Sequence, residues 1–218
     1  MPNFSILKHV QPKKTFRVAS VMGKFDLQTE HIKEQFTGSI DVDKTWQIGV
    51  IAGTSGTGKT TIAKHLFKKD YFSTYIYNSE SILDDMPKSA DIDTIVKMFN
   101  SVGFSSPPSW LKPYSVLSTG EKMRVDLARA LLEQRELIVF DEYTSVVDRN
   151  VAKIGSCAVA RAIRKTKKKF IAVTCHQDVI EWLQPDWVFD TNSMKFSYTR
   201  GLLQRPEIKL DVYETRGY

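Results

Sequence analysis

No stretch of the sequence is apolar for long enough to span a bilayer, and the first residues lack the charged-then-apolar order of a secretory signal. Internal repeats and low-complexity tracts are also missing. Only two cysteines occur, Cys157 and Cys175, and they form no cluster with metal-ligand spacing. These absences exclude a membrane channel. They predict a soluble protein of the cytoplasm, a reducing compartment, in which both cysteines are small core residues and the chain has no membrane span of its own.

The composition is that of a globular enzyme with an excess of positive charge. At 218 residues, 42% of them hydrophobic, the chain can form one large α/β domain, or a core domain with a small subdomain. The net charge is +6 and the pI about 9.2. Two basic clusters are typical of nucleic-acid contacts, although solvated helix ends give the same pattern. They comprise Lys8, His9, Lys13, Lys14 and Arg17, and Arg161, Arg164, Lys165, Lys167, Lys168 and Lys169.

Residues 53–60 read G-x-x-x-x-G-K-T, a complete phosphate loop between an apolar run at 48–52 and a helix-like stretch. The glycines let several backbone N–H groups converge on a β-phosphate, Lys59 reaches the β/γ oxygens, and Thr60 can ligate Mg²⁺. The motif therefore predicts a nucleoside triphosphate site. Its residues are Gly53, Thr54, Ser55, Gly56, Thr57, Gly58, Lys59, Thr60 and Thr61.

A second motif narrows the class of nucleotide-binding protein. Residues 117–121 read Leu-Ser-Thr-Gly-Glu and open a stretch, 122–132, whose apolar residues have helical spacing. A few residues later an apolar strand ends in two carboxylates, Asp141 and Glu142.

This order of motifs resembles the ABC ATPase family. Residues 53–60 match its Walker A loop, and 117–121 match its Leu-Ser-Gly-Gly-Gln signature with Thr119 and Glu121 at the third and fifth places. Residues 137–142 match Walker B and the catalytic Glu, 145–148 look like the D-loop, and His176 looks like the switch histidine. The whole is similar to compact members from phages and mobile elements, some of which are joined to acetyltransferase-like domains, although no acetyltransferase motif is visible here.

The resemblance implies an α/β P-loop NTPase fold, with a mainly parallel sheet core, an antiparallel β flank and a small helical insertion. We expect one domain over 1–218, with the flank at 1–47, the core at 48–80 and 136–218, and the helical subdomain at 81–135. Strands are expected at 16–21, 36–42, 48–52, 75–77, 136–142, 170–175, 187–189 and 210–214. Helices are expected at 29–35, near 151–165 and within 81–134, where Ile92, Ile95, Val96 and Phe99 share a face and Pro107 and Pro108 break the run.

The resemblance also implies a mechanism that needs ATP and Mg²⁺. Asp141 and Thr60 would hold the metal, Glu142 would polarise the attacking water, and His176 would contact the γ-phosphate beside Lys59. Two copies would pack head to tail on binding ATP. Across this interface Ser118, Gly120 and Glu121, with Asp148 of the D-loop, would close the other copy's site.

Some features depart from the family pattern. The family usually has a Gln after the strand that follows the first helix, and none is present here; Asn78 or Glu80 could substitute. An aromatic that stacks on adenine is expected upstream, where Phe16 and Phe25 are candidates but are equally good core residues. The interval between Lys59 and Ser118 is short for a transporter subunit and far too short to hold a coiled-coil arm.

Three functions remain open from the sequence. The chain could be a soluble ATPase that acts with nucleic acid or a nucleic-acid-modifying partner, as the basic clusters indicate. It could be the ATP-hydrolysing subunit of a membrane transporter. It could also be a nucleotide-gated interaction module that regulates an appended or neighbouring protein.

Overall fold

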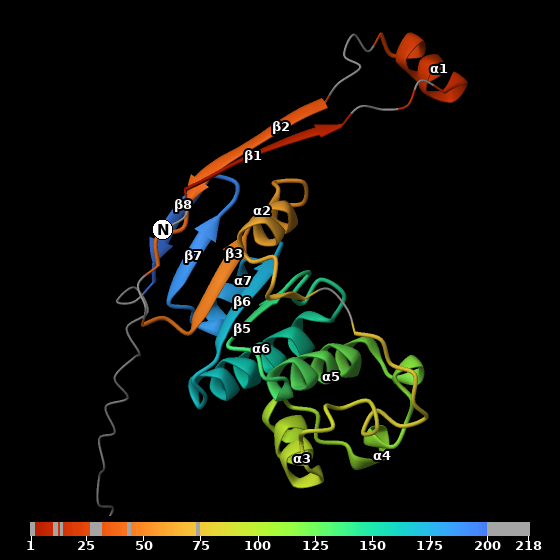
Figure 1. Ribbon diagram of the computed structural model, residues 1–218, viewed down its shortest axis with the longest axis vertical. Coiled ribbons are helices and arrows are strands. Elements are labelled where there is room, and N and C mark those ends of the chain that lie inside the picture. The colour runs from red at the N-terminus through yellow and green to blue at the C-terminus, as the bar shows by residue number, and fades with distance from the viewer. Residues whose placement is uncertain are drawn as a thin grey trace, which may run out of the picture.

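The computed structural model describes residues 3–10, 13, 15–26, 32–42, 45–72 and 75–199. Its centre is a six-stranded sheet with the order β4-β5-β6-β3-β7-β8, in which β8 is antiparallel to β7 and the other pairs are parallel (Figure 1). The strands are β3 (Ile48–Ala52), β4 (Tyr71–Phe72), β5 (Leu137–Phe140), β6 (Lys169–Thr174), β7 (Trp187–Asp190) and β8 (Lys195–Tyr198). The expected α/β fold with a mainly parallel sheet is confirmed. No helix within the described ranges is long and apolar enough to cross a membrane.

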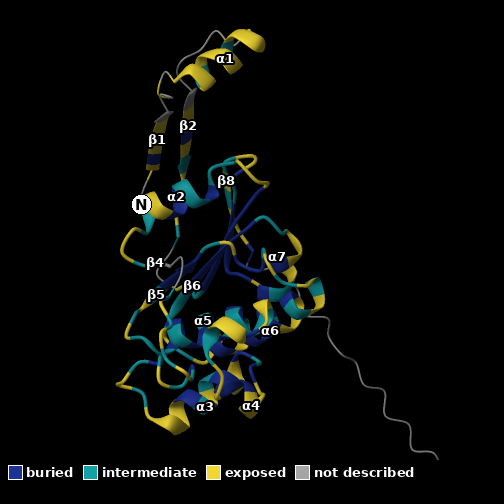
Figure 2. Cartoon of the chain, turned by 90° about the vertical axis from the view of Figure 1, so that its right-hand side faces the viewer, coloured by how far each residue is buried: buried dark blue, intermediate teal, exposed yellow. Residues whose placement is uncertain are grey.

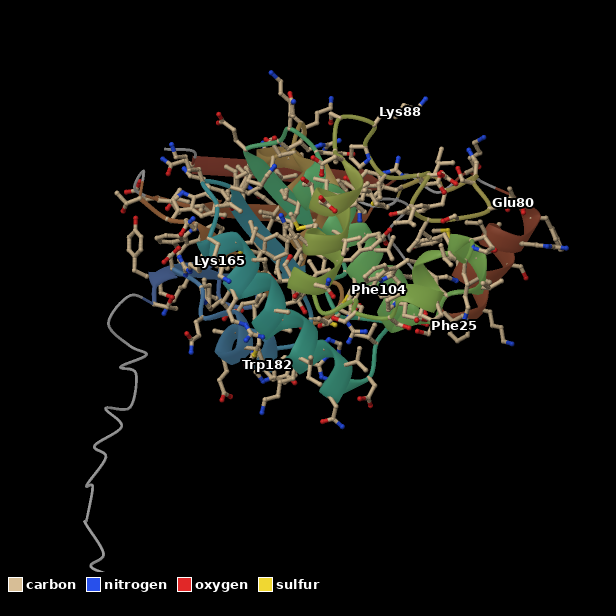
Figure 3. All side chains as sticks on the ribbon, turned by 90° about the horizontal axis from the view of Figure 1, so that it is seen from below. Phe25, Glu80, Lys88, Phe104, Lys165 and Trp182 are labelled. Atoms are coloured by element: carbon tan, nitrogen blue, oxygen red, sulfur yellow. The ribbon has the colours of Figure 1, made fainter. Side chains whose placement is uncertain are left out.

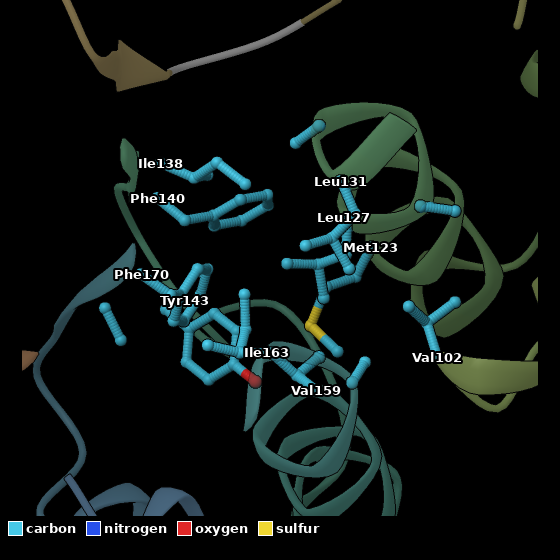
Figure 4. Packing of buried hydrophobic residues seen from close by; sticks show 14 of the residues in the cluster. Val102, Met123, Leu127, Leu131, Ile138, Phe140, Tyr143, Val159, Ile163 and Phe170 are labelled. Carbon is cyan, nitrogen blue, oxygen red and sulfur yellow. The ribbon is translucent and has the colours of Figure 1, made fainter. Parts of the chain in front are cut away.

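Both faces of the sheet are covered, which is why its central strands are apolar throughout rather than alternating. On β3, Val50 faces one hydrophobic cluster and Ile51 faces the other. The first cluster packs the sheet against α5 (Thr119–Leu132) and α6 (Arg149–Arg164), as Figure 4 shows. The second packs it against α2 (Lys59–Leu66) and the N-terminal strands. A further short helix, α7 (Asp178–Leu183), lies against α6.

The stretch between β4 and β5 is helical. It contains α3 (Ile92–Ser101), α4 (Pro107–Trp110), a 3₁₀ turn η1 (Tyr114–Val116) and α5. Of the face expected on α3, Ile95 and Phe99 are buried, but Ile92 is 57% exposed. The two prolines begin α4 instead of only breaking the run, because the first turn of a helix tolerates proline.

The N-terminal residues form a long projection that we call the arm (residues 3–39 as far as they are described). Strands β1 (Asn3–Val10) and β2 (Ile32–Ser39) pair antiparallel as a separate two-stranded sheet. Helix α1 (Phe16–Lys24) lies at the far end of this hairpin, and none of its residues is buried (Figures 1 and 2).

Several predicted elements are wrong. Residues 16–21 form the start of α1, not a strand, because Val18, Val21, Met22 and Phe25 recur at helical spacing and Thr15 caps the helix by accepting from the Val18 N–H at 3.3 Å.

The expected helix at 29–35 is strand β2 from residue 32 onward, since each of its residues pairs with β1. That strand ends at residue 39, short of the expected 42. The edge strand lies at 71–72 instead of 75–77. The predicted strand at 210–214 lies outside the described residues. Cys157 and Cys175 are free thiols, as expected, but both are half-buried and not fully in the core.

Candidate functional site

The phosphate loop connects the end of β3 to the start of α2. Gly58 caps α2 with a left-handed backbone, φ 86°, and a Cβ built on it would lie 2.5 Å from the Phe36 ring. Gly53 is equally confined, because its Cβ would lie 2.1 Å from the Thr191 Oγ1. Side chains are therefore excluded here, and the N–H groups at the start of α2 stay accessible.

Hydrogen bonds fix the shape of this loop. The Thr57 and Thr191 hydroxyls are 2.6 Å apart, and the Thr54 N–H donates to the Asn192 side chain at 3.1 Å. Lys59 is 9% exposed, and its Nζ donates to the Thr54 carbonyl at 2.7 Å. The ammonium is buried beside a neutral oxygen, so an anion placed there would stabilise it.

A cleft of about 290 Å³ lies against the loop, and we call it the phosphate cleft. From the loop and α2 it is lined by Ser55, Gly56, Gly58, Lys59, Thr60 and Thr61, and from the end of β5 by Glu142. The arm contributes Lys8, Glu34 and Phe36, which sequence reasoning missed because they lie far from the motif in the chain. Phe36 is the aromatic residue of the cleft, whereas Phe16 and Phe25 belong to the α1 region at the other end of the arm.

The residues expected to hold a metal are close together. The Thr60 Oγ1 donates to the Asp141 Oδ2 at 2.9 Å, and the Tyr71 hydroxyl donates to the same oxygen. Burial, this hydrogen bond and the nearby carboxylates raise the pKa of Tyr71, so its hydroxyl stays a donor at neutral pH.

Hydroxyl and carboxylate oxygens are ligands that Mg²⁺ prefers. In the part of the chain that the structure describes, no group of three or more His, Cys, Asp or Glu side chains could hold a metal by itself. The pair therefore fits a metal that takes its other ligands from phosphate and water.

Glu142 lies at the edge of the phosphate cleft. Its backbone has φ 51°, its side chain is exposed, and its Oε2 accepts from the Ser145 Oγ at 2.6 Å. It also lines a second cleft, of about 220 Å³, together with Thr119 and Lys122 of α5. An exposed carboxylate between these clefts can accept a proton from water bound in either.

The signature residues begin α5. Ser118 is its N-cap and Glu121 completes a capping box, in which the Glu121 carboxylate accepts from the Ser118 N–H at 2.9 Å and the Glu121 N–H donates to the Ser118 Oγ at 3.4 Å. Glu and Gln can both complete such a box, so the replacement of Gln by Glu at the fifth place of the signature keeps the cap. Ser118 is exposed, and a Cβ on Gly120 would lie 2.8 Å from the Val151 side chain.

Among the described residues, those that line the phosphate cleft do not include Ser118, Gly120, Glu121, Asp148 or His176. Asp148 is exposed and caps α6, accepting from the Asn150 N–H at 2.8 Å. His176 follows β6, and its Nδ1 is buried without a hydrogen-bond partner in the described structure. The structure thus brings the phosphate loop, Asp141 and Glu142 together, while the roles of the other five residues stay predictions.

A half-buried polar cluster occupies the region where the family has its Gln. The Asp126 carboxylate on α5 accepts from the Tyr77 and Tyr114 hydroxyls at 2.8 and 2.9 Å, and the two rings stack at 3.9 Å. Burial raises the pKa of Asp126 to about 6, although these hydrogen bonds oppose the shift. The cluster ties the segment after β4 to the signature helix. The two suggested substitutes for Gln, Asn78 and Glu80, are exposed and do not line the phosphate cleft.

Half of the basic run near the end of α6 has structural partners. Arg164 pairs with the buried Asp186 at 2.8 Å. The Lys168 Nζ donates to the Glu133 carbonyl at 2.6 Å, and Lys169 lies over the Trp46 ring at 4.9 Å. Four cations of the run are exposed, namely Arg161, Arg164, Lys165 and Lys167.

Part of the chain is similar in sequence to known proteins. Residues 69–145 match the family described as ABC transporter. An ABC transporter of Fusarium pseudograminearum is 34% identical over 102 residues, which cover 46% of this chain and 8% of that protein. The spermidine/putrescine import ATP-binding protein PotA of Mycoplasmopsis synoviae is 28% identical over 118 residues, 51% of this chain and 25% of that protein.

Solved structures support the fold. An ABC transporter of metal-chelate type in an inward-facing conformation superimposes with a TM-score of 0.57 at 19% identity, covering 78% of each chain. A bacterial Atm1-family ABC exporter with ATP bound gives a TM-score of 0.57 at 18% identity, over 74% of this chain and 35% of that one.

The alignments span only a small part of the sequence relatives, and the expected similarity to phage proteins stays a prediction. The chain is therefore similar to ABC ATP-binding proteins over part of its length, including residues 69–145, and it shares the fold of the solved ABC transporter structures.

Proposed function

We propose that the protein binds and hydrolyses ATP with Mg²⁺, and that two copies close head to tail around the nucleotide. The observation that carries this proposal is the separation of two half-sites on one chain. The phosphate cleft is lined by its loop and Glu142, and Asp141 is hydrogen-bonded to Thr60 of that cleft, whereas the exposed N-terminus of α5 at Ser118 does not line it. A second copy can supply that missing half.

The residues of the cleft have distinct tasks in phosphoryl transfer to water. The loop N–H groups, Lys59 and the N-terminus of α2 bind the phosphate oxygens. Thr60 and Asp141 hold Mg²⁺, which would neutralise charge that develops on the phosphate oxygens. Glu142 orients the attacking water and accepts its proton, and His176 would contact a terminal phosphate.

Closure depends on the signature helix of the other copy. The first N–H groups of α5 and its helix dipole attract an anion, so Ser118, Gly120 and Glu121 cap the γ-phosphate across the interface, with Asp148 alongside. ATP then joins the copies and hydrolysis separates them, which makes the pair a nucleotide-driven clamp.

Replacing Glu142 by Gln tests this mechanism. The amide keeps the size of the side chain but cannot take the proton, so we expect unchanged ATP affinity, turnover reduced by about 10²-fold or more, and a trapped dimer. Lys59→Ala is the control, because it should remove nucleotide binding and therefore dimerisation. Light scattering that finds the Glu142→Gln protein monomeric in saturating MgATP would contradict the clamp.

The proposal also includes the partner on which the clamp acts. We retain a cytoplasmic ATPase that acts with nucleic acid or a nucleic-acid-modifying partner, for which the exposed Arg161, Lys165 and Lys167 are candidate contacts. Turnover that rises with duplex DNA and loses this stimulation steeply with salt would support it.

The second candidate is the ATP-hydrolysing subunit of a transporter, which the likeness to an import ATP-binding protein favours. Stimulation by a co-expressed multi-span membrane protein, and not by DNA, would favour this candidate instead. The third, a nucleotide-gated module that regulates a neighbouring protein, predicts slow turnover that neither addition changes.

A further inference from the structure

We propose that the arm is a dimer clasp: in the ATP-bound pair, helix α1 of each copy docks on an acidic segment, residues 80–93, of the other copy. This inference rests on the proposed head-to-tail dimer. It adds an interface that the nucleotide motifs do not require.

Helix α1 has an apolar face that its own chain leaves uncovered. Val18, Val21, Met22 and Phe25 share one side of the helix, and Arg17 and Lys24 flank that side next to Val21. Val21 is 50% exposed and Phe25 65% exposed, and no residue of α1 is buried. Helix propensity alone stabilises a helix of this length only marginally, so packing of its apolar face against a partner surface would stabilise it.

The charges of the arm and of the acidic segment are complementary. Around α1, residues 1–25 contain no Asp or Glu, but they contain Lys8, Lys13, Lys14, Arg17 and Lys24; the rest of the arm adds Lys33 against Asp26, Glu30 and Glu34. The acidic segment has one cation, Lys88, against Glu80, Asp84, Asp85, Asp91 and Asp93. Glu80, Asp84, Asp91 and Asp93 are exposed, and Figure 3 shows Glu80 and Lys88 at the margin of the molecule.

The acidic segment also offers apolar surface. Ile92 lies between Asp91 and Asp93 at the start of α3, and its side chain is 57% exposed. An exposed apolar side chain among carboxylates matches a helix that presents Val21 and Phe25 beside basic residues. A nucleic acid or a lipid surface would match the positive charge of the arm but would leave this complementary segment without a role.

The shape of the chain brings the two surfaces together in a head-to-tail pair. Helix α1 and helix α3 lie at opposite ends of the long axis of the molecule (Figure 1). A two-fold axis that places one copy's phosphate loop opposite the other copy's Ser118 runs the long axes antiparallel. The arm of each copy then lies beside the helical end of its partner. The outer half of the hairpin already lines the phosphate cleft through the paired residues Lys8 and Glu34, so the arm passes beside the site where the partner must close.

Charge reversal in the Glu142→Gln protein with MgATP tests the clasp. We expect Arg17→Glu with Lys24→Glu on the arm to weaken the dimer about tenfold or more in sedimentation equilibrium, because like charges then face each other. Asp84→Lys with Asp93→Lys on the acidic segment should do the same. An equimolar mixture of these two weakened proteins should form a tight heterodimer, since each reversed arm then meets a reversed acidic segment.

A matched control carries Arg161→Glu with Lys165→Glu, the same charge change on exposed cations away from the arm, and should dimerise like the parent. Thermal melting of each monomer checks that the fold is intact. If the arm variant melts at a lower temperature than the parent, Val21→Ser is used instead, because it keeps the charge of the arm. Val21→Ser should then weaken the dimer. The clasp is overturned if both charge-reversed proteins dimerise as well as the Glu142→Gln parent, or if their mixture forms no heterodimer. Either result leaves the proposed ATPase mechanism standing. A parent that stays monomeric in MgATP overturns both.

Discussion

The half-buried carboxyl of Asp126 should make the stability of this protein depend on pH in a window where few carboxyls titrate. Burial raises its pKa from the usual 3.8 to about 6 in the folded chain. The folded state therefore holds this proton more tightly than the unfolded state. The free energy of unfolding then falls as the pH rises from about 4 through about 6.

The magnitude follows from the shift. A difference of about two pH units between the folded and unfolded pKa corresponds to about 2 to 3 kcal/mol at neutral pH. Asn in place of Asp126 keeps a carbonyl oxygen for one tyrosine hydroxyl and removes the ionisation. We therefore expect Asp126→Asn to equal the wild type at pH 4 and to exceed it in stability by about 2 to 3 kcal/mol at pH 7.

Urea unfolding at several pH values between about 4 and 7 measures this difference directly. The exposed Asp93 provides the control, because Asp93→Asn should show no comparable dependence in this range. A difference between wild type and Asp126→Asn that stays constant within about 0.5 kcal/mol from pH 4 to pH 7 would refute the reasoning, since the carboxyl would then ionise at its ordinary pKa.

Other contacts give predictions of similar sharpness. Tyr71→Phe removes one hydrogen-bond donor from Asp141 and should change the Mg²⁺ concentration that half-saturates turnover. The affinity for ATP measured without metal should change little. An unchanged Mg²⁺ requirement would assign Tyr71 to packing alone. Glu121→Ala removes half of the capping box and should lower the free energy of unfolding by about 1 kcal/mol, whereas Glu121→Gln should retain most of it; equal losses in urea unfolding would count against the cap. Burial by itself would raise the pKa of Asp186, but hydrogen bonds from Arg164 and two backbone N–H groups lower it to about 2, so Asp186 contributes stability that is lost as the pH falls from about 4 toward 2. Asp186→Asn should flatten that acid limb in thermal melts, and an unchanged limb would contradict the assignment.

The elements predicted from the sequence agree best with the structure where one short segment contains all the residues that fix its backbone conformation. The phosphate loop follows a buried strand, and Gly58 has the left-handed backbone that its motif requires. Ser118 caps α5 and Glu121 completes the capping box, and the three-residue spacing between them already predicts this pairing. In contrast, residues 16–21 fit both a strand and a helix, because a short run of Val and Phe satisfies period two and period 3.6 alike. Period two predicts a strand here, and the longer spacing to Phe25 shows why a helix forms instead.

The sequence by itself determined the nucleotide chemistry, because Lys59, Thr60, Asp141 and Glu142 belong to contiguous motifs whose backbone geometry is local. Only the tertiary structure decided what surrounds them. Lys8, Glu34 and Phe36 reach the phosphate cleft because β1 and β2 pair and pack beside α2, and Tyr71 reaches Asp141 because β4 pairs with β5. Such contacts depend on which strands pair and which faces they bury, and no local spacing encodes the partner of a strand.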